Sequence, residues 1–157
     1  MQDKRILEAL YLENFRTVWN LCLTWLKNPA DTEDAVQETF LRLAREKRTF
    51  ESREHAKAWL LHTAKNVCRD ELRRCRRREL PLDEARNTAA PGPEIDETLA
   101  AVRALPKQYR AAIYLHYYEG LSAAQISRLL DRRESTVRSD LRRGRARLKA
   151  MLERSSE

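Results

Sequence analysis

Apolar residues recur every three or four positions over the first 25 residues, which is typical of one buried stripe of a long helix. The stripe consists of Leu7, Tyr11, Phe15, Val18, Cys22 and Trp25. Residues 28–30, an Asn-Pro-Ala segment, interrupt the pattern. Asp31 is the predicted N-cap of a second helix, because a carboxylate there can accept hydrogen bonds from the first free N–H groups. This helix continues through Val36 and Phe40 and ends near Lys47.

A third helix is predicted after an ordered loop at residues 47–54 that contains Phe50. It begins between Ser52 and His55 and ends in a cluster of arginines. Its predicted core positions are Trp59, Leu60, Thr63, Val67 and Leu72. Three amphipathic helices of this length can close a small bundle.

The pattern changes at residues 81–96, where three prolines and a glycine stand among small and acidic residues, as in an extended linker. Helical periodicity then resumes, with predicted core positions Leu99, Val102, Leu105, Ile113, Leu115 and Tyr117. We therefore predict an all-α protein with two small helical domains, at residues 1–80 and 97–157, joined by a flexible linker.

Local signals predict a helix-turn-helix near the C-terminus. Gly120 can end one helix in the left-handed conformation, and Ser122 with Gln125 forms the capping box of the next. Residues 131–134 make a short turn. A final helix then carries Val137, Leu141 and Leu148 on its inner face and Arg138, Arg142, Arg143, Arg145 and Arg147 on its outer face.

The net charge of +7 is confined to the C-terminal third of the chain. Residues 1–50 hold eight acids and eight bases, residues 51–100 hold ten of each, and the last 57 residues hold thirteen bases and six acids. A second basic cluster ends the third helix, at Arg69, Arg73, Arg74, Arg76, Arg77 and Arg78. Two basic patches on either side of an acidic connector indicate two contacts with a polyanion, although solvated helix ends are the plainer alternative for each patch alone.

Side chains at the N-terminal end of a helix in the major groove reach base edges, while those farther along meet phosphates. The final helix and the turn before it place eight candidates at that end: Arg132, Arg133, Glu134, Ser135, Thr136, Arg138, Ser139 and Arg142. Arg143, Arg145, Arg147 and Lys149 lie farther along, where we expect contacts with phosphates. Arginine can bridge two acceptors on guanine and glutamate can accept from cytosine. The alternative is a surface helix with arginines for solubility.

Other classes of function find no support in the residues. The three histidines and three cysteines follow no metal-ligand spacing, and there is no phosphate-binding glycine loop and no nucleophile motif. We expect a protein that is not an enzyme and has no cofactor or metal, with reduced and largely buried thiols. No signal peptide or apolar run long enough to span a bilayer is seen, so we expect a cytoplasmic protein without membrane insertion.

Two groups of short motifs carry a family resemblance. The first consists of residues 31–40 (DTEDAVQETF), 58–66 (AWLLHTAKN) and 70–73 (DELR), which are similar to region 2 of extracytoplasmic-function (ECF) sigma factors. Leu105-Pro106, residues 118–122 (YEGLS), Gln125-Ile126 and residues 136–139 (TVRS) are similar to region 4. The motifs span nearly the whole chain in the family's order.

This resemblance implies binding to core RNA polymerase and to promoter DNA. It places polymerase contacts at Asp34, Gln37 and Glu38. It places capture of a flipped −10 base at loop 47–56, with Phe50, Lys65, Asn66, Arg69 and Arg73 as DNA contacts. The final helix would read the −35 element, the linker would thread the polymerase's RNA channel or serve as a tether, and an anti-sigma factor would mask these faces.

Three positions depart from the family pattern. Ser135 stands where glycine is common, Lys107 where an acid is common, and Asp140 where a basic residue is usual. A carboxylate near phosphates should weaken DNA binding unless Arg138 or Arg143 neutralises it or it accepts from a base amino group. Two alternatives remain open at this point: a repressor or activator that binds DNA without polymerase, and a protein-interaction module that reads no DNA.

Overall fold

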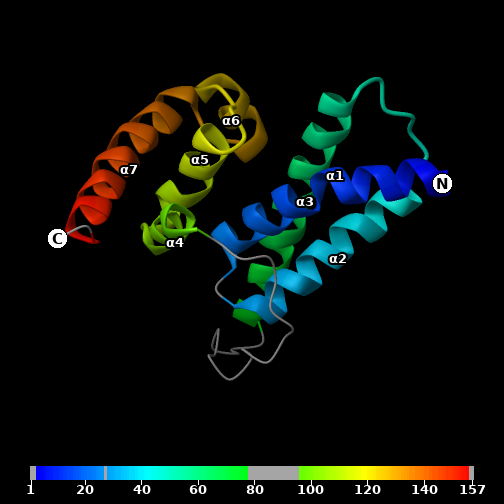
Figure 1. Ribbon diagram of the computed structural model, residues 1–157, viewed down its shortest axis with the longest axis horizontal. Coiled ribbons are helices and arrows are strands. Elements are labelled where there is room, and N and C mark those ends of the chain that lie inside the picture. The colour runs from blue at the N-terminus through cyan, green and yellow to red at the C-terminus, as the bar shows by residue number, and fades with distance from the viewer. Residues whose placement is uncertain (1–2, 27, 78–95, 156–157) are drawn as a thin grey trace. The chain divides into compact units, whose positions relative to one another are not determined.

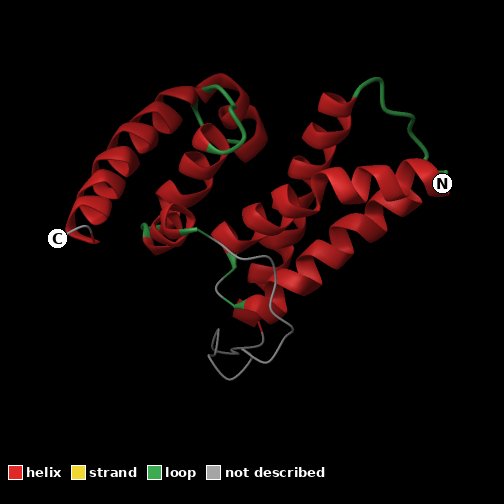
Figure 2. Ribbon diagram, in the orientation of Figure 1, coloured by secondary structure: helices red, strands yellow, loops and turns green. Residues whose placement is uncertain are grey.

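The computed structural model describes residues 3–26, 28–77 and 96–155, with the side chains of residues 75–77 excluded. These residues form seven α-helices and no strand (Figures 1 and 2). They fall into two compact units, one built from α1–α3 and one from α4–α7. The all-α prediction with two helical domains is therefore confirmed. The predicted linker lies outside the described residues except for Asp96, so its flexibility stays a prediction.

In the first unit, α1 (Lys4–Trp25), α2 (Pro29–Arg45) and α3 (Arg53–Arg77) each pack against the other two. The fully buried core contains Val18, Leu21 and Cys22 from α1, Leu43 from α2, and Leu60, Leu61, Ala64 and Cys68 from α3. Trp59, which we predicted in this core, is only half-buried. Of the predicted α1 stripe, Val18 and Cys22 are buried, Leu7, Phe15 and Trp25 are half-buried, and Tyr11 is 42% exposed.

The start of α2 differs from the prediction. The helix begins at Pro29, and Asn28 is its N-cap, since the Asp31 N–H donates to Asn28 Oδ1 at 2.8 Å. Asn28 Nδ2 in turn donates to Asp31 Oδ2 at 2.8 Å. Pro29 fits the first helical position because it needs no N–H partner there. Asp31 thus completes the cap from within the first turn instead of preceding the helix.

In the second unit, α5 (Lys107–Tyr117) packs against α4 (Glu97–Ala104), α6 (Ala123–Leu130) and α7 (Glu134–Ser155). The core contains Val102, Ile113, Leu115, Ile126, Leu130 and Val137. Tyr117, a predicted core residue, is 49% exposed, and Tyr114 is buried in its place. The hydroxyl of Tyr114 donates to Glu119 Oε1 at 2.7 Å, so its burial leaves no unsatisfied polar atom.

A pair of stacked tyrosines, Tyr114 and Tyr118, connects the end of α5 to the start of α4. The rings of Tyr114 and Tyr118 stack with centroids 5.3 Å apart. The Tyr118 hydroxyl donates at 3.2 Å to Asp96 Oδ1, which also caps α4 by accepting from the Leu99 N–H. Burial, and then the charge of Asp96 and the hydrogen bond to it, raise the pKa of Tyr118 to about 12.

Candidate nucleic-acid interface

The helix-turn-helix predicted from capping and turn signals is present at α6–α7. Both hydrogen bonds of the Ser122–Gln125 capping box are formed, and Gly120 has the positive φ of +70° expected of it. Asp131 ends α6 in the left-handed conformation, with φ 54°. Ser127 makes two hydrogen bonds with the backbone of Arg132 in the turn. The Arg132 N–H donates to Ser127 O at 3.1 Å, and Ser127 Oγ donates to Arg132 O at 2.6 Å. The turn is therefore tied to α6 before α7 begins.

One face of α7 is buried and the other is basic. Val137, Asp140 and Gly144 are the buried residues, at spacings of three and four. Five arginines are exposed as predicted: Arg138, Arg142, Arg143, Arg145 and Arg147. Because an α-helix rises about 1.5 Å per residue, this row covers about 14 Å along α7.

The eight candidates for base reading and Arg143 are not equally accessible. Six are exposed: Arg133, Ser135, Thr136, Arg138, Arg142 and Arg143. Glu134, Ser139 and Arg132 are half-buried. Arg138 Nη2 lies 2.6 Å from Glu134 Oε1, one turn away on the same helix. The two side chains that can recognise a guanine and a cytosine thus lie in contact.

Asp140 is buried on the inner face of α7, away from the exposed arginines. Burial raises the pKa of its carboxyl, while the positive charges of Arg132 and Arg143 act in the opposite direction. Its ion-pair partner is Arg132, whose Nη1 lies 3.6 Å from Asp140 Oδ2. Of the two arginines that we considered for neutralising Asp140, Arg138 pairs with Glu134 instead, whereas the charge of Arg143 does act on the Asp140 carboxyl.

In the first unit, one stripe of α3 gathers most of the residues predicted to meet the −10 element. His55, Trp59, His62, Asn66, Arg69 and Arg73 recur at alternating spacings of four and three, and all are exposed or half-buried. The Phe50 ring, from the loop before α3, stands edge-on to His55 and Trp59, with centroids 5.4 Å and 5.8 Å apart. Asn66 lies two helical turns, roughly 10 Å, beyond Trp59 on the same stripe. Aromatic rings, an amide and two arginines therefore line one face.

Lys65 does not belong to this face, which corrects our prediction that it contacts DNA. Its side chain is 0% exposed, and it occupies the α3 stripe that also carries the buried Leu61 and Cys68. One residue turns a helix by about 100°, so the neighbours Lys65 and Asn66 point in different directions. The side chains of Arg76, Arg77 and Arg78, in the predicted basic cluster, lie outside the described residues.

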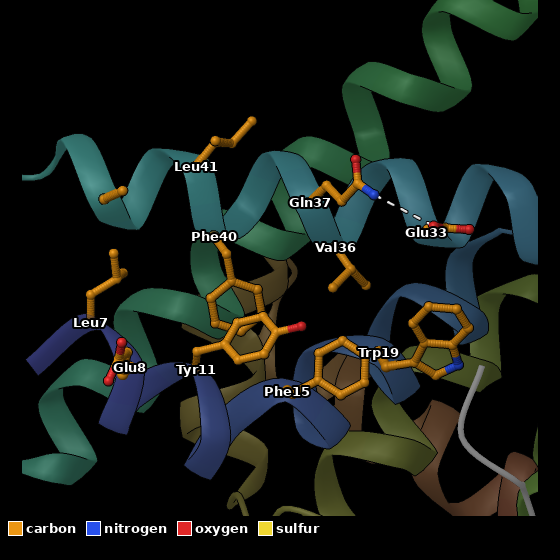
Figure 3. A pocket seen from close by; sticks show the side chains of 11 residues that line it. Leu7, Glu8, Tyr11, Phe15, Trp19, Glu33, Val36, Gln37, Phe40 and Leu41 are labelled. Carbon is orange, nitrogen blue, oxygen red and sulfur yellow. Dashed lines mark hydrogen bonds between the residues drawn. The ribbon is translucent and has the colours of Figure 1, made fainter. Parts of the chain in front are cut away.

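The α2 residues expected to bind polymerase lie on its outer surface. Asp34 and Gln37 are exposed and Glu38 is half-buried. Gln37 Nε2 donates to Glu33 Oε1 at 3.5 Å (Figure 3). Glu38 Oε1 is 3.2 Å from Arg42 Nε, and Arg42 Nη2 lies 3.7 Å from Asp70 of α3. A short ion-pair chain therefore connects this polar face to α3.

Beside that face, an apolar groove of about 650 Å³ lies between α1 and α2. Its walls include Leu7, Tyr11, Phe15 and Trp19 from α1, and Val36, Phe40 and Leu41 from α2 (Figure 3). The rings of Tyr11 and Phe40 meet edge-to-face at 4.8 Å. Sequence reasoning missed this groove because it assigned the α1 side chains to the core. The α1 sequence did contain a signal for the groove: its apolar face is wider than one stripe, since Leu10 and Leu21 lie beside the predicted positions.

Cys22 and Cys68 are buried free thiols, as predicted. A hydrogen bond with Cys22, followed by burial, raises the pKa of the Cys68 thiol, so it remains protonated. The side chain of Cys75 lies outside the described residues. Among the residues that the structure describes, no three His, Cys, Asp or Glu side chains cluster as metal ligands. None of the described helices has the length and apolar character needed to cross a membrane.

Comparison with known proteins assigns both units. The sigma-70 region 2 family matches residues 10–79, and the sigma-70 region 4 family matches residues 95–148. The ECF sigma factor SigL of Mycobacterium tuberculosis is 32% identical over 149 residues, which cover 88% of this chain and 84% of SigL. This chain is an ECF sigma factor. It therefore acts with RNA polymerase in promoter recognition through regions 2 and 4, and it is a transcription initiation factor, not an enzyme.

Further relatives of this sigma factor agree with the assignment. The ECF sigma factor SigE of Mycolicibacterium smegmatis is 35% identical, covering 95% of this chain and 62% of SigE. Among solved structures, the sigma factor RpoE of Bartonella quintana, crystallised with the anti-sigma factor NepR, has a TM-score of 0.71 at 21% identity. That alignment covers 93% of this chain and 96% of RpoE, and at this identity it supports the fold alone.

Proposed function

We propose that this sigma factor reads the −35 element with α7 and opens the promoter at the −10 element with the face formed by loop 46–52 and α3. The observation that carries the first part is the exposed arginine row of α7 directly after a capped α6 and a fixed turn. Arg133, Glu134, Ser135, Thr136, Arg138, Ser139 and Arg142 would reach base edges. Arg143, Arg145 and Arg147 would meet phosphates, which supply affinity without sequence information.

For the −10 element, we propose that a flipped base stacks near Phe50 and hydrogen-bonds with Asn66, while Arg69 and Arg73 contact the backbone. A base leaves the duplex only where stacking and hydrogen bonds replace those it loses. The rings of Phe50, His55 and Trp59 offer apolar faces, and the amide of Asn66 can donate and accept on a base edge.

Asp34, Gln37 and Glu38 are proposed to contact core polymerase. Support comes from their position on the exposed side of α2, within the matched region 2. Asp34→Arg is expected to reduce binding to core polymerase at least tenfold, because it places a cation in a contact suited to an anion. Glu13→Arg on α1 is the control for a charge change outside this face and should bind core polymerase normally.

An anti-sigma factor is the proposed regulatory partner, and the α1–α2 groove is its proposed docking site. Two structural neighbours were solved as complexes: RpoE with the anti-sigma factor NepR, and CnrH with the cytosolic domain of CnrY. The apolar floor of the groove fits one face of an amphipathic helix, and its rim residues Glu8 and Glu33 favour basic side chains on that helix. Since Gln37 lines the groove, an occupant would also cover part of the proposed polymerase contact.

Matched variants of α1 test the docking site. Leu7→Arg places a charge in the groove, whereas Leu12→Arg changes a residue of the same helix that is 79% exposed and outside it. We expect Leu7→Arg to escape inhibition by the anti-sigma factor and to keep its own transcription activity. Equal inhibition of both variants would contradict this location.

The polymerase partner also implies that the protein works in the cytoplasm.

The assignment of both DNA elements is tested by run-off transcription from a promoter library randomised at −35 and −10, using reconstituted holoenzyme. We expect enrichment of one −35 sequence that depends on α7 and one −10 sequence that depends on Asn66. Transcription that selects no sequence at −35 would contradict the role of α7.

A further inference from the structure

Arg132, in the turn before the recognition helix, makes polar contacts with both α5 and α7. Its Nη1 donates to the backbone carbonyl of Gln108, in the first turn of α5, at 3.0 Å. The same nitrogen lies 3.6 Å from Asp140 Oδ2 of α7. One guanidinium, carried by the turn, therefore connects α5 and α7. We call Arg132, Gln108 and Asp140 the brace.

The brace lies one helical turn from a close approach between α5 and α7. Asp140 and Gly144 are one turn apart on the buried face of α7. A Cβ on Gly144 would lie 2.8 Å from Ile113 Cγ1, which shows how closely the helices approach there. The turn is also fixed to α6, because Ser127 forms hydrogen bonds with both the backbone N–H and the backbone carbonyl of Arg132.

The Arg132 side chain is less exposed to solvent than that of Arg138, which is suited to DNA contact. Its side chain is 27% exposed and that of Asp140 is 11% exposed, whereas the side chain of Arg138 is 69% exposed. Releasing Arg132 toward a base would leave the Asp140 carboxylate buried without its ion-pair partner, which is unfavourable. Arg132 is therefore held at the brace, and the neighbouring Arg133 is exposed.

We propose that Arg132 and Asp140 form a positioning pair that fixes the angle of the recognition helix against α5, while Arg133 is the arginine of the turn that faces DNA. This inference rests on the proposed reading of the −35 element by α7. The proposal reverses the expected effect of Asp140 on DNA affinity. The carboxylate strengthens DNA binding through the brace, whereas an unpaired negative charge near phosphates would weaken DNA binding.

The sign of the effect of Asp140→Asn is the test. Full-length variants are assembled with core polymerase, and binding to a set of −35 sequences is measured below the melting temperature of every variant. The brace predicts that Asp140→Asn weakens binding about fivefold on all sequences, with their ranking unchanged, as expected for a lost coupling of contacting residues. Tighter or unchanged binding would overturn the proposal, since removing a negative charge alone favours DNA.

Arg132→Gln is the second variant, because it keeps a donor for the Gln108 carbonyl and removes the charge. Its effect should not add to that of Asp140→Asn, and it should leave the salt dependence of binding unchanged. Arg133→Ala is the matched control: it should change the salt dependence or one base preference and add fully to Asp140→Asn. An Arg132→Gln effect that is additive with Asp140→Asn would make Arg132 an independent DNA contact.

If the wild-type holoenzyme selects no −35 sequence, the proposed function itself fails. If the wild-type holoenzyme selects a −35 sequence and the Asp140→Asn variant binds it more tightly, only the brace is refuted.

Discussion

Lys65 and Asn66 follow one another in the sequence, but only Asn66 lies on the face suited to DNA. The sequence alone could not separate them, because lysine is rarely buried and the motif that contains both resembles a DNA-binding one. Burial was decided by α1 and α2, which pack against the stripe of α3 that carries Leu61, Lys65 and Cys68. Residue type therefore cannot distinguish a position of α3 that faces solvent from one that a neighbouring helix covers.

The pair Asn66→Ala and Lys65→Ala tests this division. We expect Asn66→Ala to lower the yield of melted promoter several-fold without changing the melting temperature, since its amide lies at the surface. Lys65→Ala should destabilise the first unit by about 2 kcal/mol, because it leaves a cavity in a packed core. Permanganate reactivity of promoter thymines and thermal denaturation are the measurements. An Asn66→Ala variant that melts promoters like the wild type would contradict the role of Asn66.

On α7, position along the helix predicts different consequences for Arg138 and Arg143. Arg138→Ala should change base preference at one −35 position by about 1–3 kcal/mol, because a bidentate contact with a base edge is lost. Arg143→Ala should weaken binding to all sequences and reduce the salt slope by about one, as expected for one phosphate contact. Holoenzyme binding to single-base variants at several salt concentrations distinguishes them. Unchanged base preference in Arg138→Ala would refute its assignment.

At the scale of elements, local signals predicted the helix-turn-helix correctly. The capping box, the left-handed Gly120 and the short turn depend on a few adjacent residues, so the sequence contains all the information they need. The α2 cap was misplaced by three residues, since Asn28 and Asp31 are both good capping residues and Pro29 decided between them. The choice of Tyr114 over Tyr117 for the core, and the α1–α2 groove, depend on how helices pack together. No local pattern specifies that.

The close approach of α5 and α7 makes Gly144 sensitive to any side chain. Gly144→Ala should lower the stability of the second unit by about 1–3 kcal/mol, because the new methyl would lie 2.8 Å from Ile113 and 3.1 Å from Tyr109. At an open helical position the same change would stabilise by up to about 1 kcal/mol. Thermal denaturation shows whether Gly144→Ala lowers or raises the stability of the second unit. Combining Gly144→Ala with Ile113→Val, which shortens the clashing side chain, should restore part of the loss, and a stabilised Gly144→Ala variant would contradict the packing.

The cap of α6 is a second test at this scale. Ser122→Ala should destabilise the second unit by about 1 kcal/mol, since the Gln125 N–H loses its acceptor. Ser122→Asp should retain most of the stability because a carboxylate can accept the same bond. Equal melting temperatures for Ser122→Ala and the wild type would show that the cap contributes nothing.

At the scale of the whole molecule, regions 2 and 4 of a sigma factor occupy separate compact units. Both units carry a net positive charge: residues 1–93 hold 18 bases and 15 acids, and residues 94–157 hold 13 bases and 9 acids. The first unit also offers an aromatic stripe, an apolar groove and a mixed-charge face. Such a pair of units can hold polymerase and DNA at the same time. That combination distinguishes an initiation factor from a repressor, which needs only the helix-turn-helix.

Factor-dependent initiation is therefore the most direct test of the account. Core RNA polymerase is assayed by run-off transcription on a template carrying the −35 and −10 sequences selected by the library, with and without the purified chain. We predict a discrete transcript only when the chain is present, and its loss when the selected −35 sequence is scrambled. Absence of the transcript, together with no binding of the chain to core polymerase, would contradict the account.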